Sequence, residues 1–173
     1  GDSVVMQMVN NQISQFANSP FPVLIEGPSG TGKELVARAL HENSEHCNEP
    51  YMAINCAAIA PELLEAQLFG HVKGAFTGDM YDHKGFFMEV GKGTLLLDEI
   101  GELPMALQGK LLRVIESGEF YRIGETTELQ SQARILAATN KNLNEEVKKD
   151  NFRNDLYHRL SILNIRLPAL NLR

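Results

Sequence analysis

Apolar positions recur at two different spacings along this chain. Near its start they follow a helical spacing, because Met6, Val9, Ile13 and Phe16 lie on one stripe after a possible helix cap at Ser3. The pattern predicts a short amphipathic helix. We expect its apolar stripe to pack into the core rather than to form a binding surface.

Further along, short apolar runs alternate with helical patterns. Strands are predicted at 23–25, 51–56, 94–97, 134–139 and 162–167, and helices at 33–41, 61–69, 105–117 and 151–160. This alternation is typical of an α/β fold, in which a mainly parallel sheet carries helices on both faces. We therefore expect a parallel five-stranded sheet.

Two stretches fit neither pattern and are expected to be loops. They are 70–78, where three glycines surround Phe76, and the polar segment 120–130. Loops this long inside a compact domain usually carry function or are disordered. The first is the better functional candidate.

A glycine-rich turn separates the first predicted strand from the next helix, and it reads Gly27-Pro28-Ser29-Gly30-Thr31-Gly32-Lys33. Backbone N–H groups in such a turn can converge on an anion, the helix N-terminus adds its positive dipole end, and Lys33 supplies a full charge. A glycine-rich surface turn is the alternative, which the flanking strand and helix disfavour. The sequence therefore predicts a nucleoside triphosphate site. Glu34 stands where a Ser or Thr normally binds Mg²⁺, so another residue has to hold the metal ion.

Two acids end the buried apolar run 94–97, and they are the best candidates for that task. Ligands of α/β sheets gather at the carboxyl ends of strands, where Asp98 and Glu99 fall. Asp98 would hold Mg²⁺ directly or through water, and Glu99 would orient and deprotonate the water that attacks the γ-phosphate. The second acid argues for hydrolysis of ATP. The alternative is a surface turn with a solvated Glu99.

Composition limits the function classes. The chain has 173 residues with 43% hydrophobic content, enough for one globular core. A net charge of −6 makes this segment a poor candidate for binding DNA through its phosphates.

Cys47 and Cys56 lack a metal-ligand spacing, and we expect Cys56 to be a buried thiol in a reducing cytoplasm. No stretch is apolar enough for a membrane span. His71 and His83 are too isolated for a metal site and are expected at the surface.

Several motifs together resemble one family. The chain is similar to the AAA+ ATPase domain of bacterial enhancer-binding activators that work with the sigma-54 form of RNA polymerase. The motifs are the phosphate loop with Glu34, Asn55-Cys56-Ala57-Ala58, Leu68-Phe69-Gly70-His71, Gly74-Ala75-Phe76-Thr77-Gly78, Leu97-Asp98-Glu99-Ile100, Ala138-Thr139-Asn140 and Phe152-Arg153-Asn154-Asp155-Leu156. The resemblance implies a P-loop NTPase fold. Glu34 is usual in this family.

The resemblance also implies roles for polar residues at strand ends. Asn55 resembles the residue that hydrogen-bonds the catalytic glutamate and couples it to the moving loops. Thr139 and Asn140 resemble the first sensor of the γ-phosphate. Taken alone, Asn55 would be an ordinary turn residue, and the other two a strand-end cap.

Arg153 and Arg159 resemble the arginine fingers that reach into the neighbouring subunit. Being six residues apart, they would project about 240° apart on one helix, so both could not face one phosphate of their own subunit. A finger in a neighbour's site makes turnover depend on assembly. The resemblance implies a ring, most often a hexamer. The alternative is a solvated basic helix face.

The segment 74–79 resembles the six-residue loop that contacts sigma-54. Gly74, Ala75, Phe76, Thr77 and Gly78 match, but Asp79 stands where alanine is usual. A carboxylate there costs desolvation unless a cation receives it. An alternative therefore stays open, in which the domain is a nucleotide-binding regulatory module that does not use sigma-54.

The resemblance finally bears on domain organisation. We expect residues 1–173 to form one AAA+ core excised from a longer regulator, without the helical lid that normally follows the last strand. Family members add an N-terminal sensory domain and a C-terminal helix-turn-helix that binds DNA. Neither is present in this chain, and a cytoplasmic location is expected.

Overall fold

The structure, a computed structural model, describes residues 2–74 and 83–169. Its centre is a five-stranded sheet in the order β2-β3-β6-β1-β7, in which every neighbouring pair is parallel. The strands are β1 (Val23–Glu26), β2 (Tyr51–Asn55), β3 (Thr94–Asp98), β6 (Arg134–Thr139) and β7 (Leu163–Arg166). The predicted parallel five-stranded sheet is confirmed.

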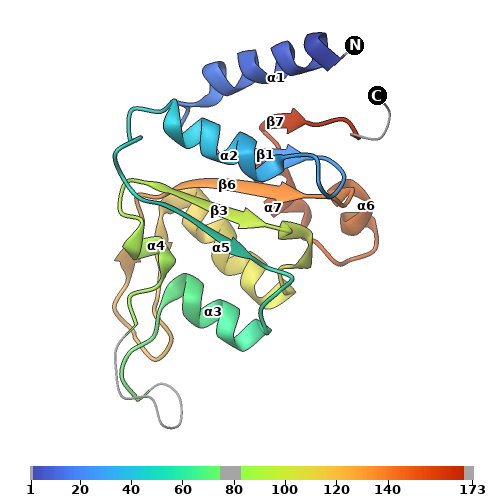
Figure 1. Ribbon diagram of the computed structural model, residues 1–173. Helices are drawn as coiled ribbons and strands as arrows, with labels where there is room; N and C mark the ends of the chain where they lie inside the picture. Colours follow the sequence, from blue (N-terminus) through green and yellow to red (C-terminus); the bar gives the residue numbers. More distant parts are fainter. Residues whose placement is uncertain (1, 75–82, 170–173) are drawn as a thin grey trace.

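Helices cover both faces of this sheet (Figure 1). One face carries α1 (Asp2–Phe16) and α2 (Lys33–Glu42), and the other carries α3 (Pro61–Phe69), α5 (Met105–Ser117) and α7 (Asn154–Leu160). The alternation of side chains along a strand produces the two layers. In β3, Leu96 packs with the α1 and α2 side, whereas Leu95 and Leu97 pack with α3 and α5.

The amphipathic stripe of α1 divides between two environments. Val9 and Ile13 are buried against the sheet, as the core prediction requires. Met6, however, is 48% exposed and lines a pocket. The prediction is therefore right for the second half of the stripe and wrong for Met6.

The segment 120–130 differs from the prediction of a plain loop. It belongs to a short antiparallel hairpin of β4 (Glu119–Phe120) and β5 (Leu129–Gln130). Phe120 is buried, with its ring centroid 6.0 Å from those of Phe69 and Phe87. Three further short elements were not predicted from the sequence: α4 (Phe86–Glu89), the 3₁₀ helix η1 (Ile100–Glu102) and α6 (Leu143–Lys148).

The predicted loop at 70–78 is closed at its base by a close backbone crossing. His71 and His83 exchange two backbone hydrogen bonds of 3.0 and 2.7 Å, and their rings stack with centroids 4.8 Å apart. Val72 also donates to the Ile123 carbonyl, which ties this base to the hairpin connection. His71 is buried, so the expectation of a surface residue is wrong.

Most of the segment that resembles the sigma-54 contact loop lies outside the described residues. Ala75, Phe76, Thr77, Gly78 and Asp79 lie outside the described residues, whereas Gly74 is described. Within the described chain no helical lid follows β7, as expected. None of the described helices combines the length and apolarity needed to cross a membrane.

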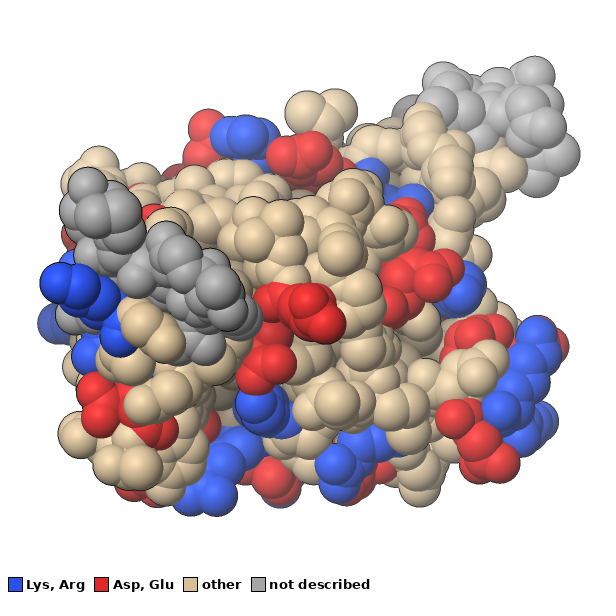
Figure 2. Space-filling view, turned by 90° about the horizontal axis from the view of Figure 1, so that it is seen from below, with Lys and Arg blue, Asp and Glu red and all other residues tan. Residues whose placement is uncertain are grey.

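Figure 2 shows acidic and basic side chains interspersed over the face seen from below.

Candidate nucleotide site

The carboxyl ends of four neighbouring strands bring the predicted site residues to one edge of the sheet. The phosphate loop follows β1, and Asn55 ends β2. Asp98 ends β3 and is followed by Glu99, while Thr139 ends β6 and is followed by Asn140. Because all these strands are parallel, their last residues lie along the same edge. β6 lies between β1 and β3, and Asn55 is in register with Asp98.

The phosphate loop leads directly into α2. Gly30 and Gly32 have φ values of 79° and 93°, in the left-handed region that glycine adopts without strain. Helix α2 begins at Lys33, and no side chain caps its N-terminus. The first N–H groups of a helix have no partner within the helix, so these are free to bind an anion.

The side chain of Lys33 is folded back into this loop and is 8% exposed. Its Nζ donates hydrogen bonds to the carbonyls of Gly27, at 2.7 Å, and Pro28, at 3.1 Å. A Cβ at Gly27 would lie 2.9 Å from Thr31 Oγ1 and 3.0 Å from the Leu167 carbonyl, so a side chain there would disrupt the loop. The ammonium group is therefore held at the anion-binding turn.

Glu34 does not take the place of the missing hydroxyl in this arrangement. Its carboxylate lies 3.6 Å from Arg38, one turn further along α2, and both side chains are about half exposed. An exposed pair of this kind adds little stability.

Asp98 is the last residue of β3, whereas Glu99 lies just outside the strand. Oδ1 of Asp98 accepts a hydrogen bond of 2.9 Å from the N–H of Glu99, which leaves Oδ2 for a metal ion. Glu99 has φ 52° and ψ 53°, a left-handed conformation that costs a residue with a Cβ roughly 1–2 kcal/mol. Such strain persists where the surroundings impose it, and it concentrates at functional sites.

Asn55 lies beside the two acids but is occupied locally. Its Oδ1 accepts a hydrogen bond of 2.9 Å from the N–H of Ala57. The amide nitrogen remains as the donor that could reach a carboxylate. The predicted restraint of Glu99 by Asn55 stays a prediction.

Thr139 and Asn140 connect β6 with the phosphate loop. Thr139 is fully buried, and its carbonyl accepts a hydrogen bond of 3.2 Å from the N–H of Gly27. Nδ2 of Asn140 donates to Ser29 Oγ at 3.0 Å. Both residues thus contact the loop expected to hold the phosphates.

The pKa of Cys56 is shifted by burial and by the acids at this edge of the sheet. The thiol is buried as predicted, and burial together with the charges of Asp98 and Glu99 raises its pKa to about 12. The neutral thiol therefore lies next to the acids across the whole physiological pH range.

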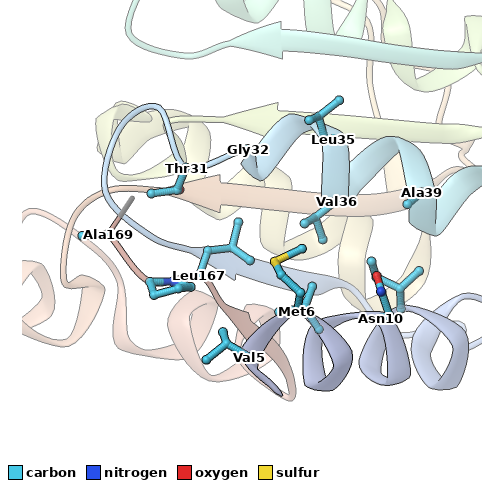
Figure 3. A pocket seen from close by; sticks show the side chains of 13 residues that line it. Val5, Met6, Asn10, Thr31, Gly32, Leu35, Val36, Ala39, Leu167 and Ala169 are labelled. Carbon is cyan, nitrogen blue, oxygen red and sulfur yellow. The ribbon is translucent and has the colours of Figure 1, made fainter. Parts of the chain in front are cut away.

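An apolar pocket of about 240 Å³ adjoins the phosphate loop. Figure 3 shows Met6 of α1 pointing toward α2, with Thr31 and Gly32 of the loop and Leu167 after β7 around the same space. The pocket is mainly apolar, which suits the flat ring of a nucleotide base. The sequence patterns did not predict this pocket, because a helical stripe does not show which of its residues stay uncovered.

Arg153 and Arg159 are placed differently from the prediction. Helix α7 begins at Asn154, and Arg153 is its N-cap with extended backbone angles, so the projection of about 240° on one helix does not apply. Arg153 forms a two-pronged ion pair with Asp155 at 3.0 and 2.8 Å. Arg159 pairs with Glu116 of α5 at 3.2 Å.

Both arginines lie along one side of α5. A Cβ at Gly109 would come within 2.6 Å of Arg153 Nη1, and Gly109 and Glu116 are seven residues apart on the same helix face. The side-chain hydrogen bond between Arg153 and Asp155 lowers the pKa of the Asp155 carboxyl and raises the pKa of the Arg153 guanidinium. The sequence placed the arginines on a helix but missed these partners.

Gln108 positions the start of α7 and was also missed. It is completely buried in α5, where Nε2 donates to the carbonyls of Leu103, at 2.8 Å, and Asn151, at 3.0 Å. Its Oε1 accepts a hydrogen bond of 2.8 Å from the N–H of Arg153. A single Gln in a helical pattern carries no signal for such a role.

Comparison with known proteins decides the family. The family model described as the sigma-54 interaction domain matches residues 1–166. The chain belongs to this family. The sigma-54 interaction domain is 51% identical over 170 residues to the anaerobic nitric oxide reductase transcription regulator NorR of Aliivibrio fischeri, covering 98% of this chain and 33% of that protein. It is 47% identical over 170 residues to the DNA-binding transcriptional regulator NtrC of Escherichia coli, covering 98% of this chain and 36% of NtrC.

Solved structures agree with this assignment. NtrX from Brucella abortus superposes with a TM-score of 0.90 at 38% identity, over 98% of this chain and 38% of NtrX. NtrX in complex with ATP gives a TM-score of 0.89 at 38% identity, over 98% of this chain and 36% of that one. The resemblance to sigma-54 activators is thereby confirmed. The P-loop NTPase fold is confirmed by the P-loop NTPase domain of a sigma-54 activator from E. coli, which superposes with a TM-score of 0.68 at 19% identity, over 98% of this chain and 99% of that one. The sigma-54 interaction domain described here spans about a third of the curated relatives it matches.

Proposed function

We propose that this sigma-54 interaction domain binds ATP with Mg²⁺, hydrolyses it in a ring, and uses the cycle to remodel sigma-54 RNA polymerase. The observation that carries the proposal is the shared sheet edge. There the uncapped N-terminus of α2 and the ammonium of Lys33 follow β1, and the acids Asp98 and Glu99 lie at the end of β3, with only β6 between the two strands. Support comes from NtrX, a relative whose structures include ADP and ATP complexes.

The donor set fits a Mg²⁺ ion that is held mainly by the nucleotide. Among the described residues no cluster of three or more His, Cys, Asp or Glu could hold a metal ion alone. Mg²⁺ usually binds one or two carboxylates together with phosphate oxygens and water, and Asp98 has a carboxylate oxygen available. The ion would neutralise negative charge on the phosphates.

Glu99 is the proposed general base. It directly follows Asp98, the proposed metal ligand, and its backbone is left-handed. From there it would orient the attacking water and accept its proton, while Lys33 and the loop N–H groups bind the phosphates. Asn55, Thr139 and Asn140 would relay the state of the γ-phosphate.

Ring assembly would complete the site with arginines from a neighbour. Arg153 and Arg159 carry side chains that are 40% and 50% exposed in the single chain, so both are accessible to a second subunit. A guanidinium on the developing phosphate charge supplies a large share of the rate in related chemistry. The family resemblance favours a hexamer in the cytoplasm.

Contact with sigma-54 is proposed for the segment 74–79, with Phe76 as the apolar contact and Thr77 as a hydrogen-bonding partner. Asp79 favours the second candidate function, a nucleotide-binding regulatory module that acts without sigma-54. Binding of DNA is proposed to belong to another domain of the full-length regulator.

The test of hydrolysis is Glu99→Gln in the full-length protein. We expect ATP affinity to be retained and turnover to fall by about 100-fold or more, because the amide cannot accept the proton of water. Glu42→Gln is the matched control, since Glu42 ends α2 at the opposite edge of the sheet. Unchanged turnover in Glu99→Gln would remove the assignment of the base.

The test of the partner is transcription from sigma-54 and sigma-70 promoters with wild type and Asp79→Ala. The main proposal expects activation at sigma-54 promoters, equal or higher in the variant. Activity confined to sigma-70 promoters would establish the second candidate function instead.

A further inference from the structure

The segment that carries Glu99 packs directly on the residues after β6. Glu99 is followed by η1, and the N–H of Glu102 donates a 3.0 Å hydrogen bond to the Glu99 carbonyl. A Cβ at Gly101 would lie 3.1 Å from Lys141 Cδ and 3.5 Å from Thr139 Oγ1. A side chain at this position would push the Lys141 side chain aside by a few tenths of an ångström, so η1 lies in close contact with the residues after β6.

Lys141 makes the polar connection across this contact. Its Nζ lies 2.7 Å from Glu102 Oε1, and its backbone N–H donates a 2.9 Å hydrogen bond to Thr139 Oγ1. The Glu102 carboxylate raises the pKa of Lys141, so the ammonium stays charged. One residue therefore binds both the strand end at Thr139 and the turn after Glu99.

The connection continues to the phosphate loop. Asn140, the residue between Thr139 and Lys141, donates to Ser29 Oγ at 3.0 Å. A movement of the loop on nucleotide binding would shift Asn140 and, with it, Lys141. Glu99 stands at the other end of this path in a strained conformation that its surroundings have to hold.

We propose that Lys141 is a positioning residue for hydrolysis, which holds η1, and through it Glu99, at a fixed place relative to Thr139 and Asn140. The inference rests on the proposed function, since it assigns Glu99 as the base. Lys141 touches neither phosphate nor water in this scheme. It acts through Glu102.

A plain surface ion pair is the competing explanation, because the side chains of Lys141 and Glu102 are 34% and 43% exposed. Such a pair contributes roughly 0–1 kcal/mol to stability and nothing specific to turnover. Lys149 provides the matched control. It forms an ion pair of 3.6 Å with Glu146, whose other carboxylate oxygen lies 3.9 Å from Lys141 Nζ, and none of the ion pairs among the described residues joins it to Glu102.

The experiment compares Lys141→Met, Lys141→Arg and Lys149→Met in the full-length protein. We expect Lys141→Met to lower kcat about tenfold with KM and Tm nearly unchanged, because a small displacement of a catalytic group costs rate rather than affinity. Lys141→Arg should recover most of kcat, and the exchanged pair Lys141→Glu with Glu102→Lys should recover part. Lys149→Met should match wild type.

Amide hydrogen exchange gives a readout that does not depend on turnover. The N–H of Glu102 should exchange faster in Lys141→Met and at the wild-type rate in Lys149→Met. Wild-type kcat and wild-type exchange in Lys141→Met would overturn the inference while leaving the proposed function intact. Loss of turnover in wild type, with the exchange effect retained, would count against the proposed function alone.

Discussion

At the residue scale, the two cysteines have opposite environments. Cys56 is buried beside the acids after β3, and its pKa is raised to about 12, whereas Cys47 is exposed. The thiolate is the reactive form of cysteine, so a buried thiol with a raised pKa is inert near neutral pH.

We predict that the folded protein reacts with a thiol reagent at one cysteine at pH 8. Cys47→Ser should abolish labelling of the folded chain, and denaturant should restore one reactive thiol. The free energy of unfolding should also fall as pH rises above about 9, because the unfolded chain releases the Cys56 proton first. Rapid labelling of folded Cys47→Ser would contradict this environment.

Glycines at the base of the 70–83 segment serve packing rather than flexibility. Gly85 has φ 81° and ψ 154°, and a Cβ there would lie 2.4 Å from the Gly70 nitrogen. A side chain meets both a conformational penalty and a backbone clash.

We predict that Gly85→Ala destabilises the fold by about 4 kcal/mol or more. Gly91→Ala is the control, because Gly91 has φ 55° but nothing within 4 Å of its Cβ position. It should cost only about 1 kcal/mol. Equal losses in denaturant titration would show that the Gly70 crossing is not as close as described.

At the element scale, Gln108 joins α5 to the segment that precedes α7. Its three hydrogen bonds satisfy backbone groups of Leu103, Asn151 and Arg153. A buried backbone group that loses its partner costs about 1–3 kcal/mol.

We predict that Gln108→Leu lowers stability by about 3 kcal/mol, or Tm by roughly 6–12 °C. The exposed Gln132→Leu should leave Tm unchanged. Arg153 should also lose its fixed backbone position, so any turnover that depends on it should fall. A Tm within 1–2 °C of wild type, read by calorimetry, would refute the role.

Sequence patterns worked best for elements with one continuous environment. The run before Asp98 is buried on both sides, so its apolar character alone predicted β3 and placed the acids at its end. The hairpin around Phe120 failed because its strands have two residues each, too short for a period. The helix predicted to begin at 151 begins at Asn154, which leaves Arg153 outside it, because a helix boundary depends on caps and tertiary partners such as Gln108.

At the scale of the whole molecule, one sheet edge collects the proposed chemistry, while the proposed fingers lie along α5. This separation fits a site completed by a neighbouring subunit. We predict that Glu99→Gln and Arg153→Ala, each inactive alone, recover part of the ATP turnover when mixed. A wild-type Glu99 in one subunit would then meet a wild-type Arg153 from the next. Mixtures as inactive as the separate variants would contradict finger donation between subunits.

The central claim is that a nucleoside triphosphate binds to the loop between β1 and α2. Calorimetric titration of the full-length protein with a non-hydrolysable ATP analogue and Mg²⁺ tests it most directly, comparing wild type with Lys33→Ala and with the exposed Lys92→Ala. We expect saturable binding by wild type and Lys92→Ala, and a loss of binding in Lys33→Ala. Equal binding by all three proteins would place the nucleotide elsewhere and contradict the account.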